Sequence, residues 1–329
     1  MLTSSYHNDI DEEILSWLLD GDVSIQYQVR RDLLGEEVSA LEALQRRIER
    51  EGWGARFLCK QNPDGHWGRA FYQPKWTSTH YTLLDLQNLS LPRGNPQPQR
   101  AIQMMFDKTV GPDGAVNFAV TKLPPDVCVT GMALGYAAYF DSSDPRIHVI
   151  VDYLLKVEMP NWGWNCEHVH GATHSSLHTT ISVLEGLLEY RRWSERGHTA
   201  IADSRAQTER LQAVRQAEAR GIEFILRHRL YMSDHTGEVI DPRFVMLSYP
   251  SRWRYDTLRA LDYFRAAGLP YDERMAAALS ILVQKRRKDG TWPLQQKHPG
   301  QVHFDMEEVG QSSRWNTLRA LRVLKAYGG

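Results

Sequence analysis

Two stretches near the C-terminal end of the chain share one motif: SRWRYDTLRALDYF at residues 251–264 and SSRWNTLRALRVL at residues 312–324. In both, an arginine and an aromatic residue precede Asp or Asn, and Thr-Leu-Arg-Ala-Leu follows. Weaker copies of this frame are STHYTLLDL from Ser78, DVCVTGMAL from Asp126, SLHTTISVL from Ser176 and IQYQVRRDLL from Ile25. A segment that recurs at intervals of roughly fifty residues is the signature of a repeat fold.

The copies align residue by residue. One residue of each copy falls at the same place at the start of an apolar stretch: Tyr27, His80, Cys128, His178, Tyr255 and Trp315. A threonine follows two positions later in every copy but the first: Thr82, Thr130, Thr180, Thr257 and Thr317. Turn motifs precede four of the copies, in NPDGHW, GPDGAV, PNWGW and KDGTW, and their glycines supply a positive φ angle.

Each copy predicts a pair of helices and no convincing strand. An amphipathic stretch such as YDERMAAALSILVQKRRK precedes the turn, and an apolar stretch such as GMALGYAAYF follows the frame. Such a pair cannot bury its apolar helix alone, so neighbouring copies have to stack, and closing the row into a ring buries every apolar helix. We therefore expect an all-α fold, one α/α toroid domain over residues 1–329 with about six inner and six outer helices. The long interval after His178 predicts an additional polar helix, SRAQTERLQAVRQAEARGIEFILRHRL.

Composition excludes several classes of protein. The 329 residues carry a formal net charge of -1, which gives no support to nucleic-acid binding. No apolar run reaches the roughly 18 residues of a membrane-spanning helix, and the N-terminus lacks a signal-peptide pattern. Three widely spaced cysteines argue against a disulfide framework, so we expect a cytoplasmic protein.

The repeats resemble a known superfamily. QNPDGHW (Gln61–Trp67) and QKRRKDGTW (Gln284–Trp292) resemble the Gln-Trp repeats of squalene cyclases, and the frame with Asp-x-Cys followed by a His-Thr helix resembles the β-subunits of protein prenyltransferases. Both belong to the terpenoid-cyclase/prenyltransferase α/α-toroid superfamily. The chain also resembles bacterial prenyltransferase/squalene-oxidase repeat proteins. It lacks the Asp-x-Asp-Asp acid motif of class II cyclases: the nearest strings, DSSD at 141 and FDMEE at 304, do not match.

The resemblance implies a zinc site. Mapped onto the prenyltransferase pattern, Asp126, Cys128 and His178 are the ligands, and Cys166 in the loop before the His178 helix is a candidate fourth. Thiolate, imidazole and carboxylate donors suit zinc. Two alternatives stay open: Asp126 as a helix N-cap with Cys128 as a small buried residue, or a metal pair of His174 and His178. Cys59 is expected in the core.

The remaining candidates lie at the same ends of the apolar helices. Arg252, Arg254 and Arg314, with Lys75 and Lys122, suit a phosphate cradle, or form ion pairs with loop carboxylates. Six aromatic residues are expected either to line an apolar, π-rich pocket or to pack in the core: Trp76, His80, Trp164, Trp253, Tyr255 and Trp315. His168, His170, His298 and His303 are expected to be surface groups, although His303 and Asp305 can also belong to a lid.

Three functional hypotheses follow. The first is a zinc-dependent enzyme of the transferase, cyclase or lyase type with a central cavity for a hydrophobic, isoprenoid or phosphate-bearing substrate. The second is a metal-free, terpene-cyclase-like enzyme with Asp256 or Asp126 as its acid. His80 and Tyr255, which are expected beside the metal, are further catalytic candidates. The third is a protein that binds an isoprenoid or another lipid without catalysis.

Overall fold

Two of the repeated helices, α11 and α13, begin where a polar side chain accepts a backbone N–H of the first turn. The computed structural model describes residues 10–119, 125–197 and 204–328. In those ranges Asp256 caps α11 (Thr257–Ala266) by accepting from Arg259 N–H, and Ser313 caps α13 (Arg314–Tyr327) by accepting from Asn316 N–H. The described strands are β1 (Trp292–Pro293) and β2 (Ser312–Ser313), which pair antiparallel. The prediction of an all-α fold is confirmed.

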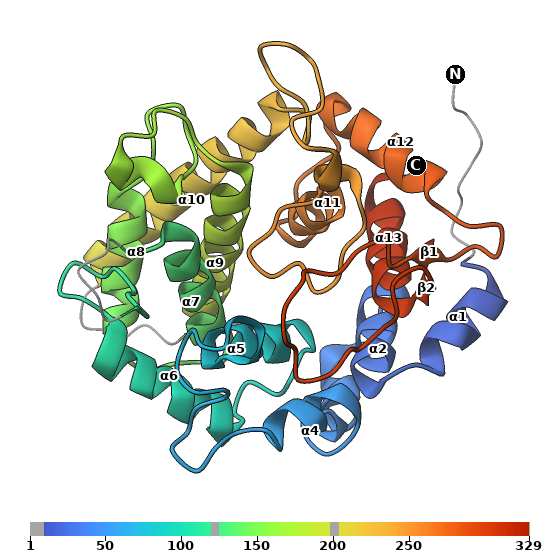
Figure 1. Cartoon of the computed structure of the whole chain (residues 1–329), viewed down its shortest axis with the longest axis horizontal. Coiled ribbons are helices and arrows are strands. Elements are labelled where there is room, and N and C mark those ends of the chain that lie inside the picture. Colours follow the sequence, from blue (N-terminus) through green and yellow to red (C-terminus); the bar gives the residue numbers. More distant parts are fainter. Residues whose placement is uncertain (1–9, 120–124, 198–203, 329) are drawn as a thin grey trace. The chain divides into compact units, whose positions relative to one another are not determined.

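The chain divides into two compact units, whose elements are coloured along the sequence in Figure 1. Unit 1 comprises Met1–Cys59, Asn88–Pro92 and Arg227–Gly329, and unit 2 comprises Lys60–Gln87 and Arg93–Leu226. The closed ring and the single domain stay predictions. No helix of the described ranges combines the length and the apolar character that crossing a membrane requires.

Unit 1 holds the first and last helices of the chain. Besides α11, α13 and the two strands, its elements are α1 (Glu12–Leu19), α2 (Val23–Gln28), the π-helix η1 (Val29–Leu33), η2 (Val38–Leu41), α3 (Glu42–Arg47), α4 (Gly52–Leu58), η6 (Pro242–Val245), η7 (Glu273–Met275) and α12 (Ala276–Gln284). α13 packs against both α11 and α2. Arg322 in α13 joins the three, because it bonds to Asp262 in α11 and to Asp32 next to α2.

Unit 2 holds the middle of the chain. Its elements are η3 (Lys75–Thr77), α5 (Thr79–Asn88, without its last residue), α6 (Pro96–Thr109), α7 (Val127–Tyr139), α8 (Arg146–Lys156), η4 (Cys166–His170), α9 (Leu177–Glu195) and α10 (Ser204–Arg227, without its last residue). α10 is the additional helix that the sequence predicts, so that prediction is confirmed.

Helices α7 and α9 lie side by side because glycines let their backbones touch (Figure 1). A Cβ atom on Gly131 would lie 2.8 Å from Val183 Cα, and one on Gly186 would overlap the Gly131 carbonyl oxygen. Small residues of this kind fix how far one helix can slide along its neighbour. The first turns of α7 and α9, which carry Cys128 and His178, are thereby held in a defined relation.

The repeated threonines have a structural task. The hydroxyl oxygen accepts an N–H from a residue one or two positions after the turn glycine, which ties the turn to the first turn of the helix. The bonds run from Val116 to Thr130 at 3.2 Å, from Trp164 to Thr180 at 3.0 Å and from Trp292 to Thr317 at 2.9 Å. In the copy around His80, Thr79 rather than Thr82 accepts the bond from Trp67. The turn glycines have positive φ, for example 78° at Gly290. The repeat therefore encodes one local unit several times.

Candidate functional site

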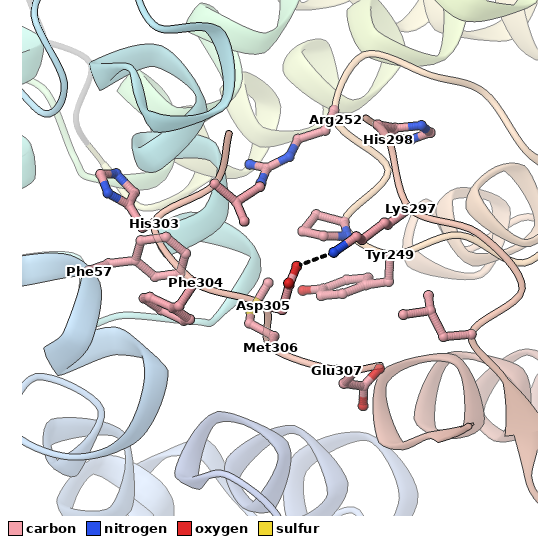
Figure 2. Close-up of a pocket in the computed structure, with 13 residues that line it drawn as sticks. Phe57, Tyr249, Arg252, Lys297, His298, His303, Phe304, Asp305, Met306 and Glu307 are labelled. Carbon is pink, nitrogen blue, oxygen red and sulfur yellow. Dashed lines mark hydrogen bonds and ion pairs between the residues drawn. The ribbon is translucent and has the colours of Figure 1, made fainter. Parts of the chain in front are cut away.

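A pocket in unit 1 gathers segments that are far apart in the sequence (Figure 2). Its walls come from the loop between β1 and β2, from residues 249–252 before α11, and from Phe57 in α4. The space that a water-sized sphere can occupy in the pocket is about 30 Å³, room for one or two water molecules. A larger ligand fits only if the loop between β1 and β2 moves.

One wall of the pocket is aromatic. Phe304 packs on Phe57 with 4.6 Å between ring centroids, and the Arg56 guanidinium lies 3.8 Å from the Phe304 centroid. Tyr249 stacks on Trp315, one of the predicted substrate contacts, with 4.6 Å between centroids and 19° between planes. Aromatic faces attract positive charge, as the position of Arg56 illustrates. The wall thus offers apolar surface that also stabilises a cation.

A half-buried carboxyl group lies in the same pocket. Glu307 accepts hydrogen bonds from the Ser313 hydroxyl and from the Trp315 N–H, the latter at 3.2 Å, so it lies at the N-terminal end of α13 (Figure 2). Burial raises the pKa of Glu307 above its usual value, although these hydrogen bonds act in the opposite direction. A carboxyl group with a raised pKa is partly protonated closer to neutral pH and can serve as an acid.

Arginine side chains surround His298, one of the two histidines that line the pocket. His298 Nε2–H donates to the Ser251 carbonyl oxygen over 3.1 Å. Burial, together with the charges of Arg254, Arg252 and Arg259, lowers the pKa of His298 to about 4. The imidazole is therefore neutral at pH 7. Arg252 is buried and has a left-handed backbone, with φ of 57°.

Two histidines of this loop depart from expectation. His298 and His303 are half-buried and line the pocket, so the expectation that they are surface groups is wrong. Asp305, the expected lid residue beside His303, is exposed and forms an ion pair with Lys297 at 2.8 Å (Figure 2). Because this pair is exposed at both ends, it contributes little to stability. The loop therefore supplies both the charged opening and the interior of the pocket.

Asp256, the acid expected from the sequence, caps a helix instead of facing the pocket. Its carboxylate accepts from the Arg259 N–H and from the Ser248 hydroxyl, both at 2.8 Å, and burial raises its pKa. Tyr255 is also buried, and its hydroxyl donates to the Leu230 carbonyl oxygen over 2.6 Å. Neither residue is part of the pocket lining, and a catalytic role for either stays a prediction.

The arginines proposed for a phosphate cradle lie against tryptophans. Arg314 donates from Nε to the Trp17 carbonyl oxygen over 2.9 Å, and its guanidinium lies 4.5 Å from the centroid of that indole. The Arg254 guanidinium lies 4.8 Å from the centroid of Trp253. Lys122 lies outside the described residues. Phosphate binding by this set stays a prediction.

The predicted aromatic contacts of unit 2 are buried. His80 lies in the first turn of α5, with Nδ1 3.3 Å from the Tyr136 hydroxyl. Trp76 packs edge-on against Tyr81. Trp164 is fully buried, and its indole N–H donates to the backbone of α8 over 2.8 Å. Between the two alternatives that the sequence left open, these contacts favour the core.

The four predicted zinc ligands lie close to the N-terminal ends of α7 and α9. Asp126 is the N-cap residue of α7, Cys128 follows in its first turn, His178 lies in the first turn of α9, and Cys166 begins η4. The Cys128 N–H donates to Cys166 Sγ over 3.3 Å. A hydrogen bond between the two thiols lowers the pKa of Cys166 to about 7 and, with burial, raises that of Cys128.

This donor set, as arranged, does not fit a zinc centre. Zinc requires three or four donors that converge to about 2.0–2.3 Å from one point. In the three described ranges, no group of three or more His, Cys, Asp and Glu side chains is placed to hold a metal ion. Asp126 is exposed, and Cys166 Sγ accepts from the backbone N–H of Cys128. Zinc binding stays a prediction. Cys59 is exposed at the end of α4, so the expectation that it belongs to the core is wrong.

Sequence reasoning missed the acid of the pocket and most of its aromatic wall. Glu307, Tyr249 and Phe304 lie outside the repeated frame, so the alignment of the copies did not mark them. One signal was present: residues 294–311, between the last turn and the last frame, form a long loop with little regular structure. Loops of this length in compact proteins are often functional.

No protein-family model matches the chain, and no curated protein matches it. Among solved structures, the apo type II terpene cyclase MstE from Scytonema is similar, with 15% identity over 88% of this chain and 97% of that chain and a TM-score of 0.34. A variant of the same cyclase in complex with geranylgeranyl dihydroxybenzoate, its substrate, has 14% identity over 96% and 97% of the two chains and a TM-score of 0.30.

Proposed function

We propose that the protein is an enzyme that acts on a hydrophobic, isoprenoid-type substrate in the unit 1 pocket and begins the reaction by proton transfer from Glu307. The observation that carries the proposal is a carboxyl group with a raised pKa in a pocket with an aromatic wall. The resemblance of the Gln-Trp motifs to squalene cyclases points to the same substrate class. Glu307 would take the place of the missing Asp-x-Asp-Asp acid.

The chemistry follows from the neighbours of Glu307. Its O–H proton forms a new C–H bond with one carbon of a substrate double bond, and the π electrons make that bond, which leaves a carbocation. The carboxylate that remains keeps the hydrogen bonds from Ser313 and Trp315 N–H, which stabilise its negative charge. The ring of Tyr249 stabilises the cation until it loses a proton to solvent. The product is an isomer of the substrate.

The basic residues of the pocket narrow the substrate further. Arg252 and Lys297 contribute positive charge to the lining, and Arg252 is one of the charges that, after burial, lower the pKa of His298. A substrate with an anionic head, such as a phosphate or carboxylate, together with an apolar chain suits this combination. The head would stay near the arginine while the chain extends over the aromatic wall.

Deuterium labelling tests the proposal. The purified protein is incubated in deuterium oxide with farnesyl and geranylgeranyl alcohols and diphosphates, and the products are separated and weighed by mass spectrometry. We expect cyclised or rearranged isomers that carry one deuterium on carbon. Glu307→Gln should lower the rate about 100-fold or more, whereas Asp305→Asn, a carboxyl change in the same loop, should leave it within about threefold. Product without deuterium, or an unimpaired Glu307→Gln enzyme, would refute the mechanism.

Two other hypotheses are decided by related measurements. Substrate-dependent changes in tryptophan fluorescence without any conversion would favour a non-catalytic isoprenoid binder. The zinc-dependent enzyme that the sequence suggests is tested by elemental analysis of the chain purified without chelator, next to Cys128→Ser and His178→Ala. The reaction proposed above has no step through zinc.

A further inference from the structure

Two cysteines that are distant in the sequence lie in contact in unit 2. Cys128 belongs to the first turn of α7, and Cys166 begins η4, 38 residues later. The Cys128 N–H donates to Cys166 Sγ over 3.3 Å, which places the two side chains next to each other. Both side chains are half-buried and therefore still within reach of small solutes. The third cysteine, Cys59, belongs to unit 1 and is exposed.

The two sulfur atoms differ in their hydrogen-bond partners. Cys166 Sγ accepts from the Cys128 N–H over 3.3 Å and from the Thr179 hydroxyl over 3.5 Å. Two donors on one sulfur stabilise a negative charge there, and the donating N–H belongs to the N-terminal turn of a helix. Cys128, in contrast, supplies the backbone donor. One cysteine is thus prepared for attack and the other is positioned beside it.

The scaffold holds this pair in place. Gly131 and Gly186 bring α7 and α9 into backbone contact, which fixes Cys128 relative to Thr179 in the first turn of α9. Asn165 caps the short helix that Cys166 begins, because its side chain accepts from the Glu167 N–H. A disulfide then requires that two neighbouring side chains bring their sulfurs to bonding distance.

We propose that Cys128 and Cys166 are a redox-active dithiol that forms a reversible intramolecular disulfide. The proposal rests on the position of Cys166 Sγ, 3.3 Å from the backbone nitrogen of Cys128, which brings together two free cysteines from distant parts of the chain. It concerns unit 2 and is independent of the activity proposed for the unit 1 pocket. The oxidant is a hydroperoxide, and the reductant is a small or protein dithiol.

The reaction balances in two steps. Cys166 sulfur attacks one peroxide oxygen, an S–O bond forms as the O–O bond breaks, and the departing hydroxide takes up the thiol proton to leave as water. Cys128 sulfur then attacks Cys166 sulfur, an S–S bond forms as the S–O bond breaks, and the second water carries away the Cys128 proton. Overall, two thiols lose two electrons and hydrogen peroxide becomes two waters. A dithiol reverses the step by exchange.

Mass spectrometry of the whole protein tests the pairing. After brief treatment with hydrogen peroxide, the native wild type should lose about 2 Da, and a digest without reductant should contain one peptide pair joined through Cys128 and Cys166. Cys59→Ser should behave as the wild type. Cys128→Ser and Cys166→Ser should both fail to lose this mass. A dithiol reductant should restore two alkylatable thiols. Two unmodified thiols after peroxide, or a disulfide that includes Cys59, would overturn the proposal.

Trapping identifies which cysteine reacts first. In Cys128→Ser, a dimedone-type probe should label a sulfenic acid on Cys166, because the second thiol is missing. In Cys166→Ser, labelling of Cys128 should be at least about tenfold weaker, because the two donors serve Cys166 Sγ. Thr179→Val, which keeps the shape of the side chain and removes one donor, should slow labelling of Cys166. Equal labelling in both serine variants would contradict the assigned order.

Discussion

Arg322 offers the sharpest test of what stabilises unit 1. Its Nε donates to Asp262 Oδ1 over 2.7 Å, and its terminal nitrogens donate to the other Asp262 oxygen, to Asp32 Oδ2 over 2.9 Å and to Gln28 Oε1 over 3.1 Å. All three charged side chains are about 12% exposed or less. Burial opposes ionisation, but the arginine charges outweigh it and hold the pKa values of Asp262 and Asp32 below their usual range.

Arg322→Met removes the central charge and keeps most of the volume. Two buried carboxylates then lose their shared partner, and breaking a buried pair in this way typically costs about 3–5 kcal/mol. Arg265 remains 3.1 Å from Asp262, and Arg31 remains 2.6 Å from Asp32, so part of the charge is still balanced. We therefore expect a loss near the lower limit, about 3 kcal/mol in the free energy of unfolding.

Urea titration at pH 7, followed by circular dichroism, measures this loss. The matched control is Arg46→Met, since Arg46 in unit 1 forms an exposed pair with Glu42 at 3.5 Å and should change stability by less than about 0.5 kcal/mol. Lowering the pH from 7 to 5 should narrow the difference between Arg322→Met and wild type. The reason is that the uncompensated carboxylates take up protons more readily when folded than when unfolded, which stabilises the variant. Equal stability of Arg322→Met and Arg46→Met would refute the reasoning.

Two further predictions concern the repeat and the pocket. Thr180→Val leaves the buried Trp164 N–H without its acceptor and should lower the free energy of unfolding by about 1–3 kcal/mol in urea titration. The control Thr236→Val, at an exposed turn, should lower it by less than about 0.5 kcal/mol. If Thr180→Val loses no more stability than the control, the proposed role of the threonine in holding the turn is wrong. The ring signals of His298 in NMR should titrate near pH 4. Because the unfolded chain takes up that proton near pH 6.5, stability should fall as the pH is lowered between these values; a midpoint near 6.5 would exclude the buried, arginine-surrounded position.

The fold class was predictable because its signals are local. The Thr-Leu-Arg-Ala-Leu motif of α11 recurs in α13, and glycine turns precede the copies, so helices could be assigned from periodicity and turn chemistry alone. The threonine at 180 was marked by the same alignment before its bond to Trp164 was known. The copy around His80 shows the limit: an equivalent bond uses a threonine three positions earlier, within one turn of the same helix.

The candidate sites were predictable only in part. The repeat alignment correctly predicted that Cys128 lies at the N-terminal end of α7, and Cys166 pointed to the loop before α9. The sequence did not determine whether these two side chains lie next to an imidazole or next to each other. Glu307 was recognised only as part of a string without the cyclase motif. Its acidity depends on burial and on the N-terminal end of α13. Those are properties of the surroundings and not of the residue type.

The amino-acid sequence by itself determined a helical repeat, its turns and the residues that begin each helix, because these follow from contacts between residues a few positions apart. The tertiary structure decided which side chains share a pocket, which carboxyl group is desolvated and which sulfur atoms touch. These outcomes depend on distances of 3–4 Å between segments tens to hundreds of residues apart, and such distances are set by how whole helices and loops pack.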